Sequence, residues 1–239
     1  MDKRLFAILA IVVVIMATSC TPTPTATVVP ISTATPSIVL EPTLGKVEST
    51  PRIAVGSAFS TELEKLLAET TGKRQWVINS NIYTTGVLRG KNVVLFLSQV
   101  SMTNAAMSTQ TALDYFNVTH LLFSGIAGGV NDALNIGDVV VPKQWAEYQE
   151  FTFVREMPGG VFTGTSDLPN FGMMFPSTVS VYQKGGEAGK TVKMRWFPVD
   201  ATLLKVAEGI ATKIKLEPCG LDKDKKPACL SYIPQIKVG

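Results

Sequence analysis

Three glycines lie close together after an apolar run near the middle of the chain, in "FSGIAGGVNDALNIGDVVVP". A glycine-rich turn binds phosphate when a helix follows it, because the N–H groups at the start of the helix then face the anion. Here turn-forming residues follow Gly129, and the next regular element is "DVVVP", which is typical of a strand stopped by Pro142. The glycines also do not form a GxGxxG or P-loop pattern. The sequence therefore predicts a loop between two strands rather than a phosphate site.

Two cysteines, Cys219 and Cys229, flank the polar and charged loop of "CGLDKDKKPAC". In an exported protein such a pair closes a disulfide. The alternative is a metal site, but the chain has no Cys-x-x-Cys spacing, and its one histidine, His120, lies far away in an apolar run. We expect a disulfide and neither a metal nor a cofactor. His120 is predicted to be a core or strand-end residue, since no partner motif accompanies it.

The first 20 residues predict export. Lys3 and Arg4 precede thirteen uninterrupted apolar residues that end at Ala17. A membrane-spanning helix needs about 20 apolar residues, so a signal peptide is the better interpretation. The ending "ATSC" resembles a bacterial lipobox, in which Cys20 becomes the lipidated first residue, although Ala17 stands where leucine is usual. The alternative is ordinary cleavage between residues 17 and 19.

Residues 21–51 are rich in threonine and contain six prolines, a composition that favours an extended tether over a packed core. Removal of the signal peptide lowers the formal net charge from +3 to +2, because residues 2–4 contribute +1. That balance does not suggest a nucleic-acid partner. The folded domain is predicted to occupy residues 52–239.

Periodicity predicts alternating strands and helices in the first half of this domain. A strand at 52–59 precedes a helix with a capping box of Thr61 and Glu64 and a stop at Gly72. Two or three paired strands follow at 75–98, with a hairpin turn at 90–92. Thr103 is predicted to cap a helix over 102–116, and "VTHLLFSG" is predicted to be a buried strand.

The second half has weaker periodicity. Residues 143–198 predict long loops with occasional short strands, followed by a helix that Asp200 caps. Its inward residues should be Leu203, Leu204, Ala207, Ile210 and Ile214. A last strand, "SYIPQIKVG", has no covering helix after it, so we expect an incomplete domain.

Four segments together resemble the nucleoside phosphorylase and nucleosidase superfamily: "IAVGSAFSTELEKLL", "TTGVLRGKNVVLFLSQVSMTNAAMSTQ", "FSGIAGGVNDALNIGDVVVP" with "KQWAE", and "FPVDATLLKVAE". The likeness is greatest to methylthioadenosine and S-adenosylhomocysteine nucleosidases and to plant bark-storage proteins. It implies an α/β fold with three α/β/α layers around a mixed, barrel-like sheet, truncated at its carboxyl end. It also implies cleavage of the N-ribosidic bond of a purine nucleoside or thionucleoside.

The resemblance also implies site residues. Glu62 matches the water-activating glutamate if one extra residue is allowed in "GSAFSTE"; alternatively it is a first-turn carboxylate that offsets the helix dipole. Val100 and Ser101 match the turn that faces the ribose and the attacking water, or serve only to cap the helix. No arginine or lysine lies between residues 98 and 129, which favours water over phosphate as the acceptor.

The same resemblance places Ala127 and Gly128 against the purine, where a flat ring must approach main chain closely. Ile126 stands where nucleosidases usually have serine, a departure shared with the bark-storage branch. In the family, a Met-Glu pair and then a Ser-Asp pair, whose aspartate protonates the purine, follow a strand of the "KVG" type. Neither pair follows that strand here, because Gly239 is the last residue of the sequence. We therefore expect the chain to be inactive unless its reading frame continues past Gly239.

Three hypotheses remain open. The first is an exported, membrane-tethered nucleosidase, with homo-oligomers as a family implication. The second is a noncatalytic nucleoside-binding or storage protein on the same fold. The third is a solute-binding lipoprotein, which would require two lobes with repeated strands and helices, and the sequence has no such repeat.

Overall fold

The computed structural model describes residues 45–147, 149–164, 168–183, 185–221, 224 and 226–239, together with the backbone of residues 38 and 39. The chain divides into two compact units, Met1–Ala127 and Gly128–Gly239. The predicted signal peptide with Cys20, and most of the predicted tether, lie outside the described residues. Among the described residues, no helix combines the length and the apolar composition needed to cross a lipid bilayer.

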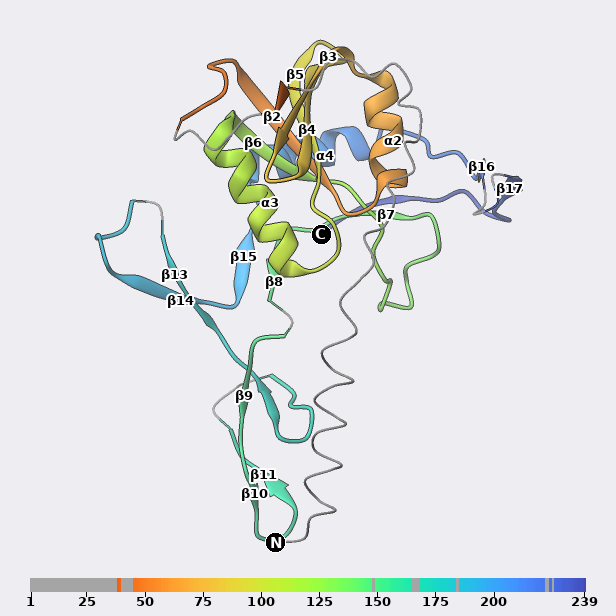
Figure 1. Ribbon diagram of the computed structural model, residues 1–239. Coiled ribbons are helices and arrows are strands. Elements are labelled where there is room, and N and C mark those ends of the chain that lie inside the picture. The colour runs from red at the N-terminus through yellow and green to blue at the C-terminus, as the bar shows by residue number, and fades with distance from the viewer. Residues whose placement is uncertain are drawn as a thin grey trace, which may run out of the picture. The chain divides into compact units, whose positions relative to one another are not determined.

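A six-stranded sheet organises the first unit (Figure 1). Its spatial order is β1-β3-β4-β5-β2-β6, so β2 lies between β5 and β6 and runs parallel to both. In contrast, β4 is antiparallel to β3 and to β5, which makes the sheet mixed as predicted. The strands are β1 (Ile38–Val39), β2 (Pro51–Ser57), β3 (Thr71–Ile78), β4 (Asn81–Leu88), β5 (Lys91–Leu97) and β6 (Asn117–Phe123).

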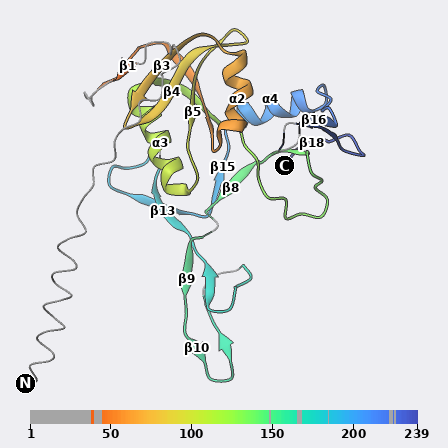
Figure 2. The ribbon, with the colours of Figure 1, turned by 45° about the vertical axis from the view of Figure 1, so that its right-hand side comes forward.

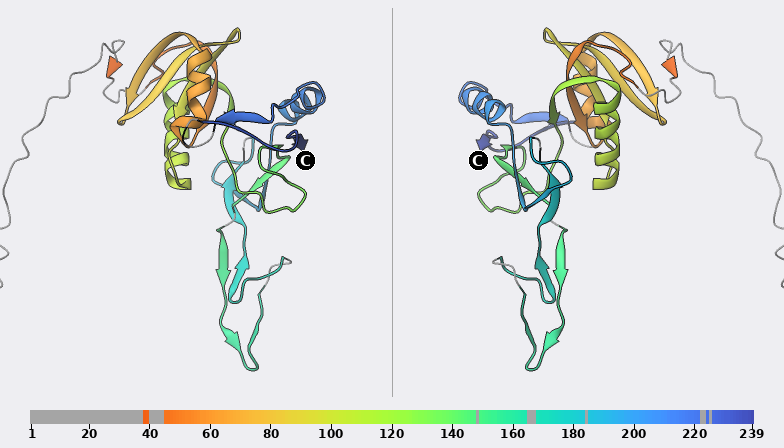
Figure 3. Two further views of the ribbon diagram at one scale, coloured as in Figure 1. Left: turned by 90° about the vertical axis from the view of Figure 1, so that its right-hand side faces the viewer. Right: turned by 90° about the vertical axis from the view of Figure 1, so that its left-hand side faces the viewer.

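Helices α2 (Ser60–Glu69) and α3 (Met102–Tyr115) cover opposite faces of this sheet, as Figure 2 shows. Successive strand residues point to opposite faces. Accordingly, Val55 on β2 packs in one cluster with Leu63 of α2, whereas its neighbour Ala54 packs in another with Ala112 of α3. The predicted three-layer α/β/α architecture is therefore confirmed, and the sheet between the helices is strongly curved (Figure 3).

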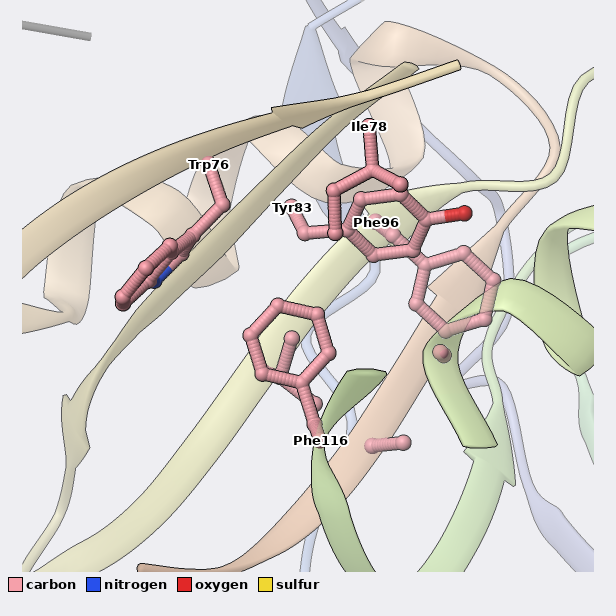
Figure 4. Packing of buried hydrophobic residues seen from close by; sticks show 8 residues of the cluster. Trp76, Ile78, Tyr83, Phe96 and Phe116 are labelled. Carbon is pink, nitrogen blue, oxygen red and sulfur yellow. The ribbon is translucent and has the colours of Figure 1, made fainter. Parts of the chain in front are cut away.

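The larger cluster lies on the α3 face and is rich in aromatic side chains (Figure 4). Phe116, at the end of α3, meets Trp76 edge to face at 6.1 Å between ring centroids and Tyr83 at 5.7 Å. Tyr83 stacks on Phe96 and donates its hydroxyl hydrogen to the carbonyl of Ser108, 3.0 Å away. Strand β4 is thus fixed to helix α3 by both packing and a hydrogen bond.

Both hairpin turns of this unit are two residues long, and their residues have positive φ. Arg89 and Gly90 connect β4 to β5, one residue before the predicted turn at 90–92. Asn79 and Ser80 connect β3 to β4 in the same way. Turns with positive φ at both positions match the twist of paired strands, which explains their use here.

Three predicted helix ends are wrong. Helix α2 begins after Phe59, and Glu62 rather than Glu64 turns back to bind its first N–H groups. It ends at Glu69, and Gly72 already belongs to β3. In α3 the cap is Ser101, whose hydroxyl accepts from the N–H of Asn104, so Thr103 lies inside the helix.

The predicted tether and the predicted buried strand also need correction. Residues 45–51 are folded onto the first unit, because Val47 packs against the core and its N–H donates to Tyr115 at 2.7 Å. The folded part thus begins before residue 52. Strand β6 is at the edge of the sheet and is largely exposed, since the order of strands leaves it one neighbour.

The second unit consists of short strand pairs and helix α4 (Ala201–Ala211), which Asp200 caps as predicted. Strand β7 (Val139–Val141) pairs in parallel with β18 (Ile236–Val238). The other pairs are antiparallel: β8 (Gln144–Ala146) with β15 (Trp196–Pro198), β9 (Phe151–Phe153) with β12 (Met174–Pro176), β10 (Glu156–Met157) with β11 (Val161–Phe162), β13 (Val179–Tyr182) with β14 (Thr191–Met194), and β16 (Cys219–Leu221) with β17 (Pro227–Cys229).

Burial in the second unit is slight. Among its described residues only Phe175 and Pro234 are buried. Leu203, Leu204 and Ala207 of α4 are half-buried, whereas Ile210 and Ile214, which were predicted to point inward, are exposed. The helix is therefore in the predicted place, but its apolar side is only partly covered.

Candidate functional site

The carboxyl ends of three parallel strands, β5, β2 and β6, lie side by side in the first unit. From the central strand β2 the chain passes through α2, β3 and β4 to β5, which lies on one side of β2. It then passes through α3 to β6, which lies on the other side of β2. In open α/β sheets, ligands bind at such a change of direction, beyond the carboxyl ends of the strands. The topology therefore singles out the segments that follow Ser57, Leu97 and Phe123.

A hollow of about 250 Å³ lies at this edge. Its lining combines apolar side chains with main chain and contains no charged residue: Ala58, Phe59, Ser98, Gln99, Val100, Ser101, Met102, Ala105 and Phe123. Both helices that cover the sheet begin here, α2 after Phe59 and α3 after Ser101. Helix amino ends carry partial positive charge, so the hollow is polarised without any cationic side chain.

Glu62 lies in the first turn of α2, and its carboxylate bonds two residues that line the hollow. Its Oε2 accepts hydrogen bonds from the N–H groups of Ala58 and Phe59, each at 2.8 Å. Its Oε1 accepts a third from the N–H of Ile126, also at 2.8 Å. The predicted site residue thus joins the end of β2 to the glycine segment after β6.

These contacts decide the charge of Glu62. Burial is the largest single influence and raises its pKa, but the N–H groups of Ile126, Phe59 and Ala58 together outweigh it, so the pKa lies below its ordinary value. Hydrogen bonds that favour the charged form have this effect. Glu62 is therefore a carboxylate at neutral pH.

Gly125 is what allows the carboxylate to come this close. A Cβ at Gly125 would lie 2.9 Å from Oε1 and 3.1 Å from Oε2 of Glu62. Such an atom would force the carboxylate to shift, which would disturb its bonds to three N–H groups. The absence of a side chain at Gly125 therefore lets Glu62 keep its observed position.

Val100 and Ser101 both line the hollow, and both also shape the start of α3. The Val100 carbonyl accepts from the side-chain amide of Asn104 at 2.7 Å, and the Ser101 hydroxyl accepts from its backbone N–H at 3.3 Å. The Val100 side chain is 61% exposed. The two predicted roles, a helix cap and a ligand-facing turn, are compatible in this geometry.

The other predicted residues are placed differently. Ile126 is 81% exposed, and its N–H donates to Glu62. Ala127 ends the first unit and Gly128 begins the second, with open space where its Cβ would be. No helix follows the glycines, in agreement with the rejection of a phosphate loop.

His120 and the cysteines lie away from the hollow. His120 is exposed on β6, where Nδ1 meets the hydroxyl of Thr119 at 3.1 Å, so it is a strand residue but not a core residue. Cys219 and Cys229 form a disulfide between β16 and β17. Because both sulfurs are used in this disulfide, the two cysteines do not form the metal site that was the alternative prediction.

Sequence reasoning missed several residues of the hollow, chiefly Phe59, Ser98 and Phe123. Ser98 is buried, and its hydroxyl donates to the carbonyl of Gln99 at 3.0 Å. Nearby, the buried hydroxyl of Ser57 has no hydrogen-bond partner among the described residues. The sequence feature that could have identified these residues is their position, since each lies at or near the carboxyl end of a predicted strand.

A second hollow, of about 510 Å³, lies in the second unit between strands β9 to β12. Its lining includes aromatic residues such as Phe153, one cationic side chain, Arg155, and one anionic side chain, Glu156. A GKT triplet was expected to be absent from the chain, but Gly189, Lys190 and Thr191 form one, and it leads into strand β14 rather than a helix. It is therefore no phosphate loop.

Comparison with known proteins agrees with this architecture. A model of the Phosphorylase superfamily matches residues 52–219. The 5'-methylthioadenosine/S-adenosylhomocysteine nucleosidase of Lysinibacillus sphaericus is 40% identical over 90 residues, which are 38% of this chain and 39% of that protein. The nucleosidase of the same name from a Geobacillus species is 29% identical over 164 residues, or 69% of this chain and 59% of that one. The chain thus spans between two fifths and three fifths of the length of these relatives.

Solved structures are similar in fold. The S-adenosylhomocysteine nucleosidase of Streptococcus pyogenes, in complex with 5-methylthiotubericidin, has a TM-score of 0.50 and 20% identity, covering 81% of this chain and 63% of that one. Futalosine hydrolase of Helicobacter pylori has a TM-score of 0.50 and 16% identity, covering 79% and 62%. At this identity the likeness supports the α/β fold alone.

Proposed function

Because this chain belongs to the phosphorylase superfamily, we propose that it is a purine-nucleoside N-ribosyl hydrolase, whose first unit supplies the water-facing side of the site. The observation that carries the proposal is the ionised Glu62 beside a hollow without cationic side chains, at the carboxyl edge of parallel strands. Its relatives named as methylthioadenosine/S-adenosylhomocysteine nucleosidases favour a purine nucleoside or thionucleoside as the substrate.

The chemistry fits the charge of the hollow. Cleavage of the bond between C1′ and the purine nitrogen gives the ribosyl group positive character in the transition state, which a nearby carboxylate stabilises. Water then bonds to C1′ through its oxygen and loses one proton, and the purine leaves with one proton on its nitrogen. The resemblance assigns delivery of that proton to an aspartate that follows the "KVG" strand in the family. Phosphate as the acceptor would require cationic partners, and the hollow offers none among its described lining residues.

Purine release is the direct test. The purified protein is incubated with methylthioadenosine, adenosine or inosine, with and without phosphate, and the products are separated by chromatography. We expect no release by these 239 residues, because the family's leaving-group acid follows the "KVG" strand. If the reading frame continues past Gly239 with that acid, the longer protein should give free purine and the free sugar at a rate that phosphate does not change. A phosphate-dependent rate with a sugar phosphate as product would overturn the choice of acceptor.

The matched variants are Glu62→Gln and Glu64→Gln. Loss of the carboxylate at residue 62 should lower kcat about 100-fold or more, the usual range for a positioned acid or base. Glu64 is exposed on the same helix and contacts neither the hollow nor the glycine segment, so its variant should keep the wild-type rate. Equal rates in all three proteins would refute the role of Glu62.

A second candidate is a noncatalytic nucleoside-binding or storage protein. Ile126 favours it, because a large exposed apolar side chain stands in the segment that the family places against the base. Calorimetry with methylthioadenosine decides between the two, since a binder gives a saturable heat of binding without any free purine.

We also propose that the protein is exported and lipid-anchored through Cys20 to a bacterial membrane. The signal-like residues 1–20 support this, and a disulfide between Cys219 and Cys229 suits an oxidising compartment. Metabolic labelling with a radioactive fatty acid should mark the wild-type protein and not Cys20→Ala. Label in both proteins, or in neither, would contradict anchoring at this residue.

A further inference from the structure

Glu62 and Ile126 are 64 residues apart in the sequence, yet they are joined by a charge-assisted hydrogen bond. The carboxylate that makes it is itself held by the N–H groups of Ala58 and Phe59. Those two groups belong to the rigid junction between β2 and α2. Glu62 therefore connects two segments: Oε2 is bonded to the junction between β2 and α2, and Oε1 is bonded to the glycine segment.

The segment Gly125–Ala127 makes few other contacts with the rest of the first unit. The last ladder bond of the sheet on this side is donated by Ser124 to the carbonyl of Gly56, at 3.0 Å. Beyond it, the side chain of Ile126 is exposed and makes no core contact. Among the described residues of the first unit, the bond to Glu62 is the one hydrogen bond that Gly125–Ala127 makes.

Gly125 shows that this contact is built into the backbone. Its φ is not in the left-handed region, so an alanine would suit the local conformation. What excludes a Cβ is the carboxylate of Glu62, at 2.9 Å. Glu62 thus fits against Gly125 in shape and is hydrogen-bonded to the next residue, Ile126.

We infer that Glu62 is a positioning residue for the segment Gly125–Ala127, and that it sets the place of the main chain against which the base of a nucleoside would lie. A carboxylate offers about four acceptor positions, and three are used here, which leaves one for a water molecule. The same side chain can therefore hold this segment and face the attacking water. The part of this inference that concerns the base rests on the proposed function. The attachment of Gly125–Ala127 to Glu62 through the N–H of Ile126, called the anchor below, does not.

Amide hydrogen exchange of Ile126, followed by NMR in the full chain without ligand, tests the anchor. Glutamine keeps one acceptor oxygen, which the two N–H groups of Ala58 and Phe59 should retain in Glu62→Gln. The NH2 group then faces Ile126 and cannot accept from it, so Ile126 should exchange roughly tenfold faster or more. Gly125→Ala keeps the carboxylate of Glu62 but pushes it away from Ile126, and should accelerate exchange of the same amide. The amide of Val94, buried in the sheet, reports global unfolding and should accelerate only by the few-fold that the loss of global stability accounts for, less than Ile126.

Two control variants match these changes. Gly129→Ala adds the same methyl group four residues later, where nothing lies nearer than 3.7 Å to the new Cβ, and should leave Ile126 protected. Glu64→Gln removes an exposed carboxylate from the same helix and should also leave it protected. In the double variant of Glu62→Gln and Gly125→Ala, the second change should add little to the first, because both break one contact.

Unchanged exchange of Ile126 in Glu62→Gln and in Gly125→Ala would overturn the inference. So would equal acceleration of Ile126 and Val94, because Glu62 would then act only on global stability. Calorimetry with methylthioadenosine forms a separate arm, in which Gly125→Ala should weaken binding at least several-fold and Gly129→Ala should not. If the wild-type protein binds no nucleoside, the proposed function fails while the exchange result still decides on the anchor.

Discussion

At Glu62 a single side chain meets three backbone N–H groups within one turn of helix α2 and one loop. The helix begins at a phenylalanine, which has no side-chain acceptor, so the carboxylate three residues later does the work of a cap. Structural and chemical roles therefore coincide at this residue. Its charge follows from the same three bonds.

The lowered pKa of Glu62 makes its stabilising effect depend on pH. In the unfolded chain a glutamate titrates near pH 4.3, and in the folded chain it titrates lower. Its contribution is therefore complete above about pH 5 and is lost as the pH falls through the folded-state pKa. Urea unfolding should show Glu62→Gln less stable by about 1 kcal/mol at pH 7, with a smaller difference at pH 3. A difference that grows toward acid would contradict this.

Asp138 has a comparable role in the second unit. Its side chain is 3% exposed, accepts from the N–H groups of Asn135 and Gln235, and pairs with Lys237 at 3.3 Å. Those two N–H bonds, with a smaller effect of Lys237, hold its pKa below the ordinary value. A turn before β7 is thereby joined to the chain that leads into β18.

Replacement of Asp138 by Asn should loosen this junction, because an amide cannot accept from both backbone groups and also neutralise Lys237. Hydrogen exchange should accelerate at Val139, whose N–H donates to the carbonyl of Gln235 at 2.9 Å. Asp132→Asn, an exposed change in the same loop, is the control and should leave Val139 unaffected. Equal effects of both variants would show that loop charge matters rather than the bonds of Asp138.

At the scale of elements, helix α3 is held to the sheet by one side only. Phe116, just after its last turn, is fully buried between Trp76 and Tyr83, while Met107 on its outer side is 64% exposed. The helix has a weak amphipathic pattern because alanine, serine and threonine fill most of its length. A few aromatic contacts therefore carry most of its attachment.

Truncation of Phe116 to alanine should lower the free energy of unfolding by about 3 to 5 kcal/mol, the usual cost of removing a buried aromatic side chain. Met107→Ala, on the exposed side of the same helix, should change it by no more than about 0.5 kcal/mol. Urea unfolding followed by circular dichroism measures both. A comparable loss in the two variants would mean that helix propensity, rather than packing, holds α3 in place.

At the scale of the whole molecule, the two units differ in how much they bury. All but one of the buried apolar residues of the described chain lie in the first unit, apart from prolines, and the exception is Phe175. Exposed apolar side chains are frequent in the second unit, among them Phe153, Trp145 and Ile233. Regions with few buried contacts open locally at low cost in free energy.

Limited trypsin digestion should reveal this difference. Arg155 and Lys190, in the sparsely packed second unit, should be cut well before Arg74 in strand β3 of the first sheet. Mass spectrometry of early time points would identify the order. Cleavage at Arg74 as early as at Arg155 would show that the sheet offers no more protection than the short strand pairs.

Local sequence patterns determined much of the fold. The continuous apolar runs of β2 and β5, the capping Asp200, and the turn formers after Gly129 all act within a few residues, so each could be predicted. The α/β class followed from the order of these elements. Cys219 and Cys229, in an exported protein, likewise predicted a loop closed by a disulfide, and the two are bonded.

Tertiary structure alone decided the rest. That Glu62 meets Ile126, that Gly125 makes room for it, and that β6 takes an exposed edge all depend on segments far apart in the sequence. Residue types and short-range periodicity carry no information about which loops converge at the end of a sheet. That convergence is set by strand order, because the carboxyl ends of β5, β2 and β6 become neighbours only when β2 lies between the other two.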